Sequence, residues 1–338
     1  YSFILVVAAL AALGVVILSS AGDVNAMRLH GDPYYFMKRQ LSFLGFGVLL
    51  AAAVAAFDYR RWRRQWILAA AFYVAVFALL VAVFAFRPIN GSHRWIPVGP
   101  LRIQPSEFAK LAAVIAIAAY LDRISWRVEL FWRGAFVATL ILGFMAGPVC
   151  LEPDFGSTMV IALVGLLVMY VSGARFLHVA SIGLAGIAVV GVQVLSNANR
   201  MARILEFLGT SATSVGAGAA VTESAKVAAE YQAKMALVAI SRGGLWGVGL
   251  GESMQKQAYL PEAHTDFIFA VGAEELGFFF SLATILLFVL FFVLSMRIAR
   301  AASGRFGRAL VMGMAFIIFF PYQLYERYAN AIYAAQVI

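Results

Sequence analysis

Long apolar runs separated by short polar stretches dominate this chain. A helix needs about 20 mainly apolar residues to cross the hydrocarbon core of a bilayer, where every backbone N–H and C=O group must be paired within the protein. Nine runs meet or approach this length, so we predict an all-α, polytopic bundle of nine transmembrane helices. The runs are residues 2–21, 40–57, 66–86, 106–121, 133–150, 157–172, 176–196, 266–296 and 306–335.

Composition agrees with a membrane protein and argues against a nucleic-acid partner. Charged residues make up 13% of the chain, against about 25% in ordinary soluble domains. The net charge of +9 comes from arginines between apolar runs and not from a basic domain. The single cysteine, Cys150, excludes an internal disulfide and a cysteine-based zinc site. Residues 2–21 lack a basic leader and an A-x-A cleavage pattern, so we interpret them as a membrane helix and not as a signal peptide.

Basic residues between the runs predict the orientation of the bundle. Twelve arginines lie in the loops at 58–65, 122–133, 173–175 and 297–308, whereas the other short loops hold six basic residues. Because cytoplasmic loops are enriched in Lys and Arg, we place the first set, and the N-terminus, in the cytoplasm. The segments then expected outside are residues 22–39, 87–105, 151–156 and 197–265.

The longest outer segment, residues 197–265, is too long for a simple connection, and loops of this kind are usually functional or disordered. We treat it as a large extracytoplasmic loop within one integral-membrane domain, residues 1–338. Its middle, residues 209–229, is small and polar and is expected to be mobile. Its end holds Trp246 and five glycines, so we predict a packed re-entrant element there.

The triplet HTD closes this segment and places His264 and Asp266 directly before the eighth apolar run. One interpretation of Asp266 is a helix cap, since an aspartate at that position accepts the free backbone N–H groups. The second half of a capping box is missing, because Ile268 and Phe269 stand where Glu or Gln would bond back. The other interpretation is a general base, since apolar surroundings raise the pKa of a carboxyl group towards neutrality.

A metal ion is a third alternative for this region. His264 has no His or Cys partner at the spacing of a transition-metal site. Asp266 and Asp154 could serve a hard divalent cation, magnesium or manganese, which prefers oxygen ligands. The chain has no P-loop and no dinucleotide-binding glycine motif. No nucleotide cofactor is therefore expected, and the energy for any transfer must come from an activated substrate such as a lipid-linked pyrophosphate sugar.

The stretch GSHRWIPVGPLRIQPSEFAKLA carries Arg94 and Trp95 and then a helix that we expect to begin at Pro105. Glu107 and Lys110 are three residues apart, so they project from the same face of that helix. Ionisable side chains inside a span are costly and are usually paired or face a wet cavity. The two form either a structural ion pair or part of a polar site.

Two further pairs of acids are candidates for the same polar site. Glu152 and Asp154 flank a proline between two runs, where they are either solvated turn residues or face an outer cavity. Glu274 and Glu275 lie inside the eighth run, and we expect one of them to share a polar cavity with Lys110. The cations expected to hold phosphate or pyrophosphate groups are Arg94, Lys110 and Lys256.

Three stretches closely resemble the SEDS family of cell-wall polymerases, the group of RodA, FtsW and SpoVE. They are GSHRWIPVGPLRIQPSEFAKLA, EPDFGS and GGLWGVGLGESMQKQAYLPEAHTDFIFAVGAEELGF, and the likeness covers most of residues 1–310 with a lean towards the FtsW branch. The family usually has a tenth helix after a further motif, whereas this chain reads FFPYQLYERYANAIYAAQVI there. A family motif in the large outer loop is replaced here by residues 209–229.

The resemblance implies a peptidoglycan glycosyltransferase in the bacterial cytoplasmic membrane, working with a class B penicillin-binding protein. Its substrate would be lipid II, polymerised into glycan strands on the outer face for cell division or elongation. The essential acid of the family's HTDF motif falls on Asp266. Other motif residues of the family fall on Arg94, Trp95, Glu107, Lys110 and Asp154.

On this basis we expect Asp266 to take the proton of an acceptor hydroxyl as it attacks a sugar linked to undecaprenyl pyrophosphate, with inversion at the anomeric carbon. Glu107, Asp154 and Glu274 would shape the cavity. A flippase for lipid-linked precursors is the competing class, since buried ionisable groups also suit a polar pathway. A scaffold that only binds a partner helix is the remaining alternative.

Overall fold

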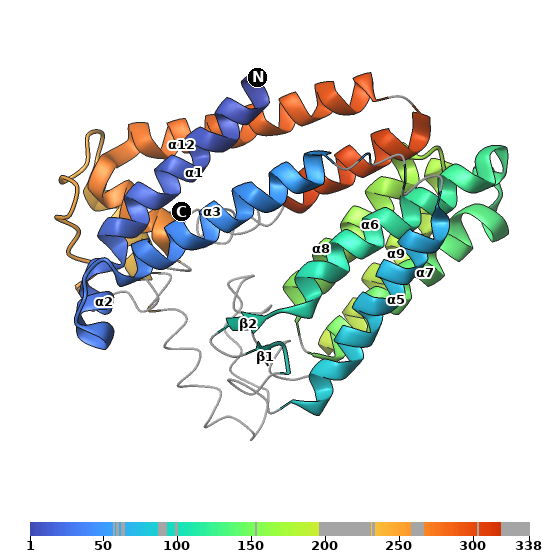
Figure 1. Ribbon diagram of the computed structural model, residues 1–338, viewed down its shortest axis with the longest axis horizontal. Coiled ribbons are helices and arrows are strands. Elements are labelled where there is room, and N and C mark those ends of the chain that lie inside the picture. Colours follow the sequence, from blue (N-terminus) through green and yellow to red (C-terminus); the bar gives the residue numbers. More distant parts are fainter. Residues whose placement is uncertain are drawn as a thin grey trace. The chain divides into compact units, whose positions relative to one another are not determined.

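The computed structural model has a helix in each of the nine apolar runs, the last run (306–335) being described only to residue 318. It describes residues 1–56, 58, 61, 65–86, 93–98, 101–152, 154–195, 231, 234–257, 267–302 and 304–318. The long helices are α1 (Ser2–Ala21), α2 (Asp23–His30), α3 (Tyr35–Ala56), α5 (Trp66–Ala82), α6 (Pro105–Ile124), α7 (Val137–Leu151), α8 (Phe155–Val171), α9 (Phe176–Leu195) and α12 (Ile268–Ala301) (Figure 1). Residues 234–243 and 304–318 are also helical.

Shorter elements join these helices. They are the 3-10 turns η1 (Val83–Ala85) and η2 (Ser125–Glu129), the π-helical turn η3 (Phe131–Phe136), and strands β1 (Ile96–Val98) and β2 (Leu101–Ile103). The strands form an antiparallel hairpin in which Ile96 pairs with Ile103. The all-α prediction is therefore confirmed for the bundle, and the hairpin is an addition that the hydropathy pattern did not predict.

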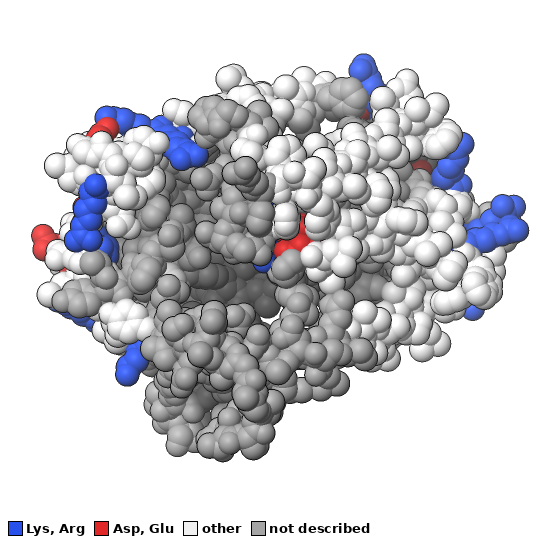
Figure 2. Space-filling view, turned by 90° about the horizontal axis from the view of Figure 1, so that it is seen from below, with Lys and Arg blue, Asp and Glu red and all other residues white. Residues whose placement is uncertain are grey.

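Five of the described helices are long and apolar enough to cross a membrane. They are α1, α3, α5 with η1, the continuous η3–α7 segment, and α12, and shorter apolar helices occur within α8 and α9. Much of the described surface in Figure 2 carries neither acidic nor basic side chains. This agrees with the membrane location predicted from composition.

The described chain divides into two compact units. One contains residues 58–192 and 292–324, and its centre is α6, which packs against α5, α7 and α8. Small side chains on α6 let its neighbours approach closely: Ala109 and Ala113 are buried in the same cluster as Val114 and Ile117. Close packing of this kind brings polar side chains at the start of α6 near the ends of α7 and α8.

The other unit contains residues 1–57 and 193–291, among them α1, α2, α3 and the first part of α12. Its small apolar cluster consists of Ala21, Ala236, Ala239, Ala270 and Val271. The packing predicted for the end of the large loop is confirmed for residues 244–257, which bond to α12. That this element re-enters the membrane stays a prediction. The predicted mobile stretch 209–229 lies outside the described residues.

Helix α12 is broken at Gly277, whose φ of 74° and ψ of −165° are not helical. The loop after residue 243 occupies the break. Val248 N–H donates to the Glu274 carbonyl at 3.0 Å, and Gly249 N–H donates to the Glu275 carbonyl at 3.0 Å. These bonds replace the ones that the helix loses at the break. The helix predicted over 266–296 is confirmed from residue 268, and the break at Gly277 is a feature that the hydropathy pattern did not predict.

Glycine is required where the loop meets the break. A Cβ atom at Gly277 would lie 2.4 Å from the Gly247 nitrogen, and a Cβ atom at Gly247 would lie 2.1 Å from the Glu275 carbonyl oxygen. Both glycines have positive φ angles, which L side chains rarely adopt.

We predict that Gly277→Ala lowers thermal stability in detergent much more than Gly251→Ala. Gly251 also has a positive φ, of 89°, but a Cβ atom there would meet nothing within 4 Å. Backbone strain should lower the stability of the control variant by only about 1–2 kcal/mol. Overpacking should lower the stability of Gly277→Ala by roughly 1–3 kcal/mol more. Equal shifts of the two unfolding midpoints would contradict the close packing of loop and helix.

Candidate functional site

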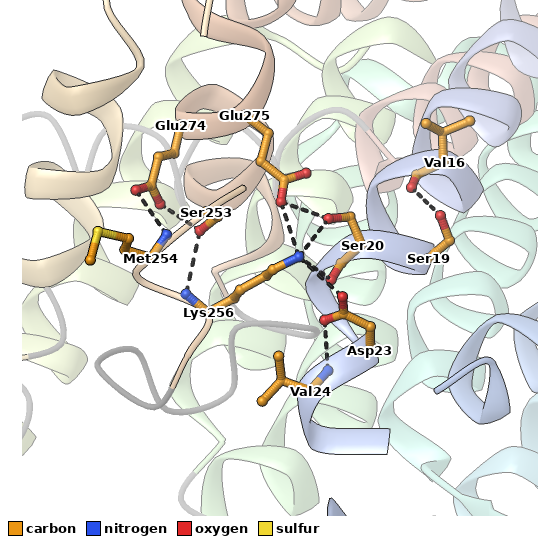
Figure 3. A network of polar contacts seen from close by, with 10 residues as sticks. All are labelled: Val16, Ser19, Ser20, Asp23, Val24, Ser253, Met254, Lys256, Glu274 and Glu275. Carbon is orange, nitrogen blue, oxygen red and sulfur yellow. Dashed lines mark hydrogen bonds and ion pairs between the residues drawn. The ribbon is translucent and has the colours of Figure 1, made fainter. Parts of the chain in front are cut away.

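Lys256 is the centre of a buried polar cluster in the unit that contains α1. Its Nζ atom lies 3.0 Å from Ser20 Oγ, 3.2 Å from the Ser20 carbonyl, 3.1 Å from Asp23 Oδ2 and 3.4 Å from Glu275 Oε1 (Figure 3). The lysine side chain is only 2% exposed. One ammonium group thus joins the end of α1, the start of α2, the large loop and α12.

The two neighbouring glutamates of α12 bond to different parts of the same loop. Glu274 accepts hydrogen bonds from Ser253 Oγ at 2.5 Å and from Met254 N–H at 3.3 Å. It also lies 3.5 Å from Arg242 Nη1. Glu275 accepts a bond of 2.6 Å from Ser20 Oγ, while its Oε2 atom is buried and has no hydrogen-bond partner among the described residues.

We call this set the Lys256 cluster. Its members, from four segments of the chain, are Ser20, Asp23, Arg242, Ser253, Lys256, Glu274 and Glu275. Glu274 and Glu275 are completely buried, and a buried charge is tolerated only when it is paired and hydrogen-bonded.

Within this unit, the lysine that contacts Glu275 is Lys256. That Lys110 shares a polar cavity with one of the two glutamates stays a prediction. Lys256 and Glu274 were expected to take part in a substrate cavity. In this structure the acceptors of the Lys256 ammonium are protein oxygens, so its binding of phosphate stays a prediction.

A second polar cluster lies in the unit built around α6. Asp154 is the N-cap of α8, since its Oδ1 atom accepts a 3.2 Å bond from Ser157 N–H. Its Oδ2 atom accepts a 3.3 Å bond from the Gln104 amide, which also contacts Ser106 Oγ at 2.9 Å. Arg94 Nε lies 3.5 Å from the Glu152 carbonyl. We call Arg94, Gln104, Ser106, Glu152 and Asp154 the Asp154 cluster.

Both acids of this cluster are buried, so the alternative of a solvated turn was wrong. Glu152 is 1% exposed and Asp154 is 8% exposed. Within the part of the chain that the structure describes, neither side-chain oxygen of Glu152 has a hydrogen-bond partner. Burial, together with the nearby Asp154 carboxylate, raises the pKa of Glu152 to about 7, although Arg94 acts in the opposite direction.

Glu107 and Lys110 form the ion pair that their spacing predicts, with 2.8 Å between Lys110 Nζ and a Glu107 carboxylate oxygen. The lysine side chain is 9% exposed and the glutamate side chain is 56% exposed. Trp95 directly precedes β1 and is partly buried.

Asp266 and His264, the two candidates next to the eighth run, lie outside the described residues. Among the residues that are described, no three His, Cys, Asp or Glu side chains form a metal-binding group. Divalent-cation binding at Asp154 or Asp266 stays a prediction.

Sequence reasoning missed several members of the two clusters. Ser20 ends the first apolar run and Asp23 follows it, and neither carries a motif signal of its own. Gln104 and Ser106 lie inside a motif stretch, but neither side chain is ionisable. Long-range packing, which local spacing does not reveal, gives these residues their partners.

Several long apolar helices and two clusters of buried charged side chains place this protein in the class of polytopic helical membrane proteins. In such proteins, buried ionisable groups usually mark a functional site. Within this class, the family model for FtsW, RodA and SpoVE, described as "Cell cycle protein", matches residues 1–330. The chain therefore belongs to this family.

Similar proteins and structures agree with this assignment. A protein of Pseudomonas fluorescens named probable peptidoglycan glycosyltransferase FtsW is 37% identical over 91% of this chain and 74% of its own length. Stage V sporulation protein E of Bacillus subtilis is 35% identical over 90% of this chain and 80% of its own.

Among solved structures, the rod shape determining protein RodA of Thermus thermophilus matches with a TM-score of 0.67 and 25% identity, covering 98% of this chain and 85% of that one. A chain from a structure described as a peptidoglycan synthase complex that coordinates polymerization and crosslinking matches with a TM-score of 0.74 and 26% identity, over 97% and 86% of the two chains.

We predict that Glu152→Gln makes the protein more stable in detergent at pH 8 and flattens its stability between pH 4.5 and 7. The pKa of Glu152 is about 7 when folded, against an ordinary value of 4.5. Between these values the folded state holds a proton that the unfolded state has lost, so stability falls as pH rises through this window. The gain at pH 8 is at most about 3 kcal/mol.

Thermal unfolding of the two proteins from pH 4.5 to pH 8 measures this difference. Glu129→Gln is the matched control, because the Glu129 side chain is 62% exposed beside Arg175. The same pH slope in Glu152→Gln and in the unmodified protein would show that Glu152 is ionised in the fold.

Proposed function

We propose that this chain is a peptidoglycan glycosyltransferase that polymerises lipid II into glycan strands on the outer face of the bacterial cytoplasmic membrane. The observation that carries the proposal is the similarity over nearly the whole chain to relatives named probable peptidoglycan glycosyltransferase FtsW, at 34% to 37% identity. The two buried polar clusters support it, because they place charged groups inside an otherwise apolar bundle. The arginine-rich loops support a cytoplasmic N-terminus.

In the proposed reaction, the Asp266 carboxylate accepts the proton of the acceptor sugar hydroxyl. The hydroxyl oxygen bonds to the anomeric carbon of the donor as the bond from that carbon to the pyrophosphate oxygen breaks. Undecaprenyl pyrophosphate leaves with the electron pair of that bond. A single displacement of this kind inverts the anomeric centre.

The leaving pyrophosphate is an anion, so it needs a cation to stabilise it and does not need a protonated acid. Arg94 and Lys110 are the candidates for this role, with Glu107 and Asp154 shaping the surrounding site. A divalent cation, magnesium or manganese, is the alternative source of positive charge.

We further propose that the chain works with a class B penicillin-binding protein. Support comes from the similarity to a chain in a peptidoglycan synthase complex that coordinates polymerization and crosslinking. The names of the curated relatives, mostly FtsW with one sporulation protein, favour a machine of cell division over one of elongation.

A flippase for lipid-linked precursors is the second candidate function, favoured by the buried charges of the Lys256 cluster. The two functions give different results with purified protein in proteoliposomes. The polymerase makes glycan strands from lipid II, whereas the flippase moves lipid II across the bilayer without forming polymer.

We predict that Asp266→Asn lowers the rate of glycan synthesis from lipid II by at least about 100-fold, which is the lower limit for the loss of a general base. The assay uses purified protein with and without a penicillin-binding protein partner. Asp32→Asn is the matched control, since Asp32 pairs with Lys38 at the surface and their side chains are 37% and 65% exposed. Full synthesis by Asp266→Asn would exclude this carboxylate as the base.

The same assay with a chelator tests whether glycan synthesis requires a divalent cation. If Arg94 and Lys110 stabilise the pyrophosphate alone, glycan synthesis continues in the chelator and falls by about 100- to 1000-fold in Arg94→Gln, the range for removal of one stabilising donor. Loss of synthesis in the chelator, with recovery on addition of magnesium or manganese, would instead assign the charge to a divalent ion.

A further inference from the structure

Four exposed arginines lie together at one end of the unit built around α6. They are Arg123 in the last turn of α6, Arg127 in η2, Arg133 in η3 and Arg175 directly before α9. The turns η2 and η3 follow α6 along the chain, and an ion pair of 3.5 Å between Arg175 and Glu129 joins the start of α9 to them. We call these four residues the arginine collar.

The collar has an excess of positive charge. In residues 119–136 and 173–178 the acids are Asp122 and Glu129, against the four arginines. The side chains of the Arg175–Glu129 pair are both exposed. Because exposed ion pairs contribute little to stability, Glu129 does not prevent Arg175 from binding another anion.

The turn that carries Arg133 is fixed by the residues beneath it. The Tyr120 hydroxyl donates a hydrogen bond to the Arg133 carbonyl. Gly134 N–H donates to the Leu130 carbonyl at 2.8 Å, and a Cβ atom at Gly134 would lie 2.0 Å from the Val128 carbonyl oxygen. Turns of π-helix are rare and frequently occur at functional sites. Arginines that only set the orientation of a membrane protein act through their number on one side of the bilayer. A turn held this firmly therefore indicates a role in the folded protein.

Exposed aromatic side chains lie at the start of three apolar helices in the same unit. Trp66 begins α5, Trp132 lies in the first turn of the continuous η3–α7 segment, and Phe176 begins α9. The Arg123 guanidinium carbon lies 5.1 Å from the centre of the Trp66 ring. Aromatic side chains are enriched where a membrane helix enters the headgroup region. They place the collar at the level of the lipid headgroups.

We propose that the arginine collar binds the phosphate groups of anionic phospholipids, with Trp66, Trp132 and Phe176 lying against the first part of the acyl chains. A planar guanidinium group can donate two parallel hydrogen bonds to one phosphate. Clusters of about four to eight basic residues beside a membrane helix attract anionic lipids. Bound headgroups hold this end of the unit at a fixed depth in the bilayer. The role requires no enzymatic activity, so it is independent of the proposed glycosyl transfer.

The test counts the lipids that the purified protein retains in native mass spectrometry. The protein is mixed in detergent with phosphatidylglycerol or, separately, with phosphatidylcholine at the same concentration. The unmodified protein should retain phosphatidylglycerol in preference to the zwitterionic lipid. In the double variant Arg133→Gln, Arg175→Gln the apparent association with phosphatidylglycerol should fall by about fivefold for each arginine removed, the factor for one basic residue near an anionic surface. Binding of phosphatidylcholine should not change.

The matched control is the double variant Arg28→Gln, Lys38→Gln. It also removes two exposed cations, which lie in α2 and α3 and outside the collar. This variant should retain phosphatidylglycerol as the unmodified protein does. An equal loss in the control would assign the preference to the net charge of the whole protein and would overturn the proposal.

Two further variants separate charge from folding. Arg133→Lys with Arg175→Lys keeps both charges, so it should retain much more phosphatidylglycerol than the glutamine pair. Glu129→Gln removes a carboxylate from beside Arg175 and should strengthen the association. If the lysine pair loses as much as the glutamine pair, or if Glu129→Gln brings no gain, the positive charge of the collar is not what binds the lipid.

Glycerol phosphate tests whether the ligand is a lipid or a soluble anion. It carries the same phosphate chemistry without acyl chains, so an excess of it should leave phosphatidylglycerol bound to the unmodified protein. Displacement of the lipid would show a site for soluble phosphates and would exclude the role of the aromatic side chains. Equal retention of the two lipids by the unmodified protein would exclude the collar as an anionic-lipid site.

Discussion

The need to pair every backbone polar group inside an apolar bundle determines the arrangement around α12. The helix breaks at Gly277, and the loop from residue 243 supplies the missing hydrogen bonds to the carbonyls of Glu274 and Glu275. The same two residues direct their carboxylates towards Ser253 and Lys256. The break, the packed loop and the buried charges are therefore one structural unit, since each provides partners that another lacks.

The two polar clusters compensate the cost of burying charged side chains in different ways. In the Lys256 cluster, opposite charges and hydroxyl groups compensate Glu275 and Asp23. In the Asp154 cluster, capping bonds compensate Asp154, whereas the Glu152 carboxylate has no hydrogen-bond partner among the described residues and its pKa rises towards 7. The local supply of hydrogen-bond donors thus differs between the two clusters.

Local sequence patterns predicted the features whose partners are local. The described parts of the apolar runs are helical because length and hydropathy select helices in an apolar environment. The three-residue spacing of Glu107 and Lys110 places them in contact. The break at Gly277 and the pairing of Lys256 with Asp23 were not predictable in this way. Their partners lie far away in the sequence, and only the packed structure brings them together.

The attachment of residues 244–257 to α12 has a consequence for how this chain can vary. These residues keep their position through contacts with α1, α2 and α12, so they do not depend on the length of the chain that precedes them. Closing a longer flexible loop adds only about 0.6 kcal/mol for each doubling of its length. Residues 197–230 are thus free to be lengthened, shortened or replaced in evolution, while the element next to the HTD triplet keeps its geometry.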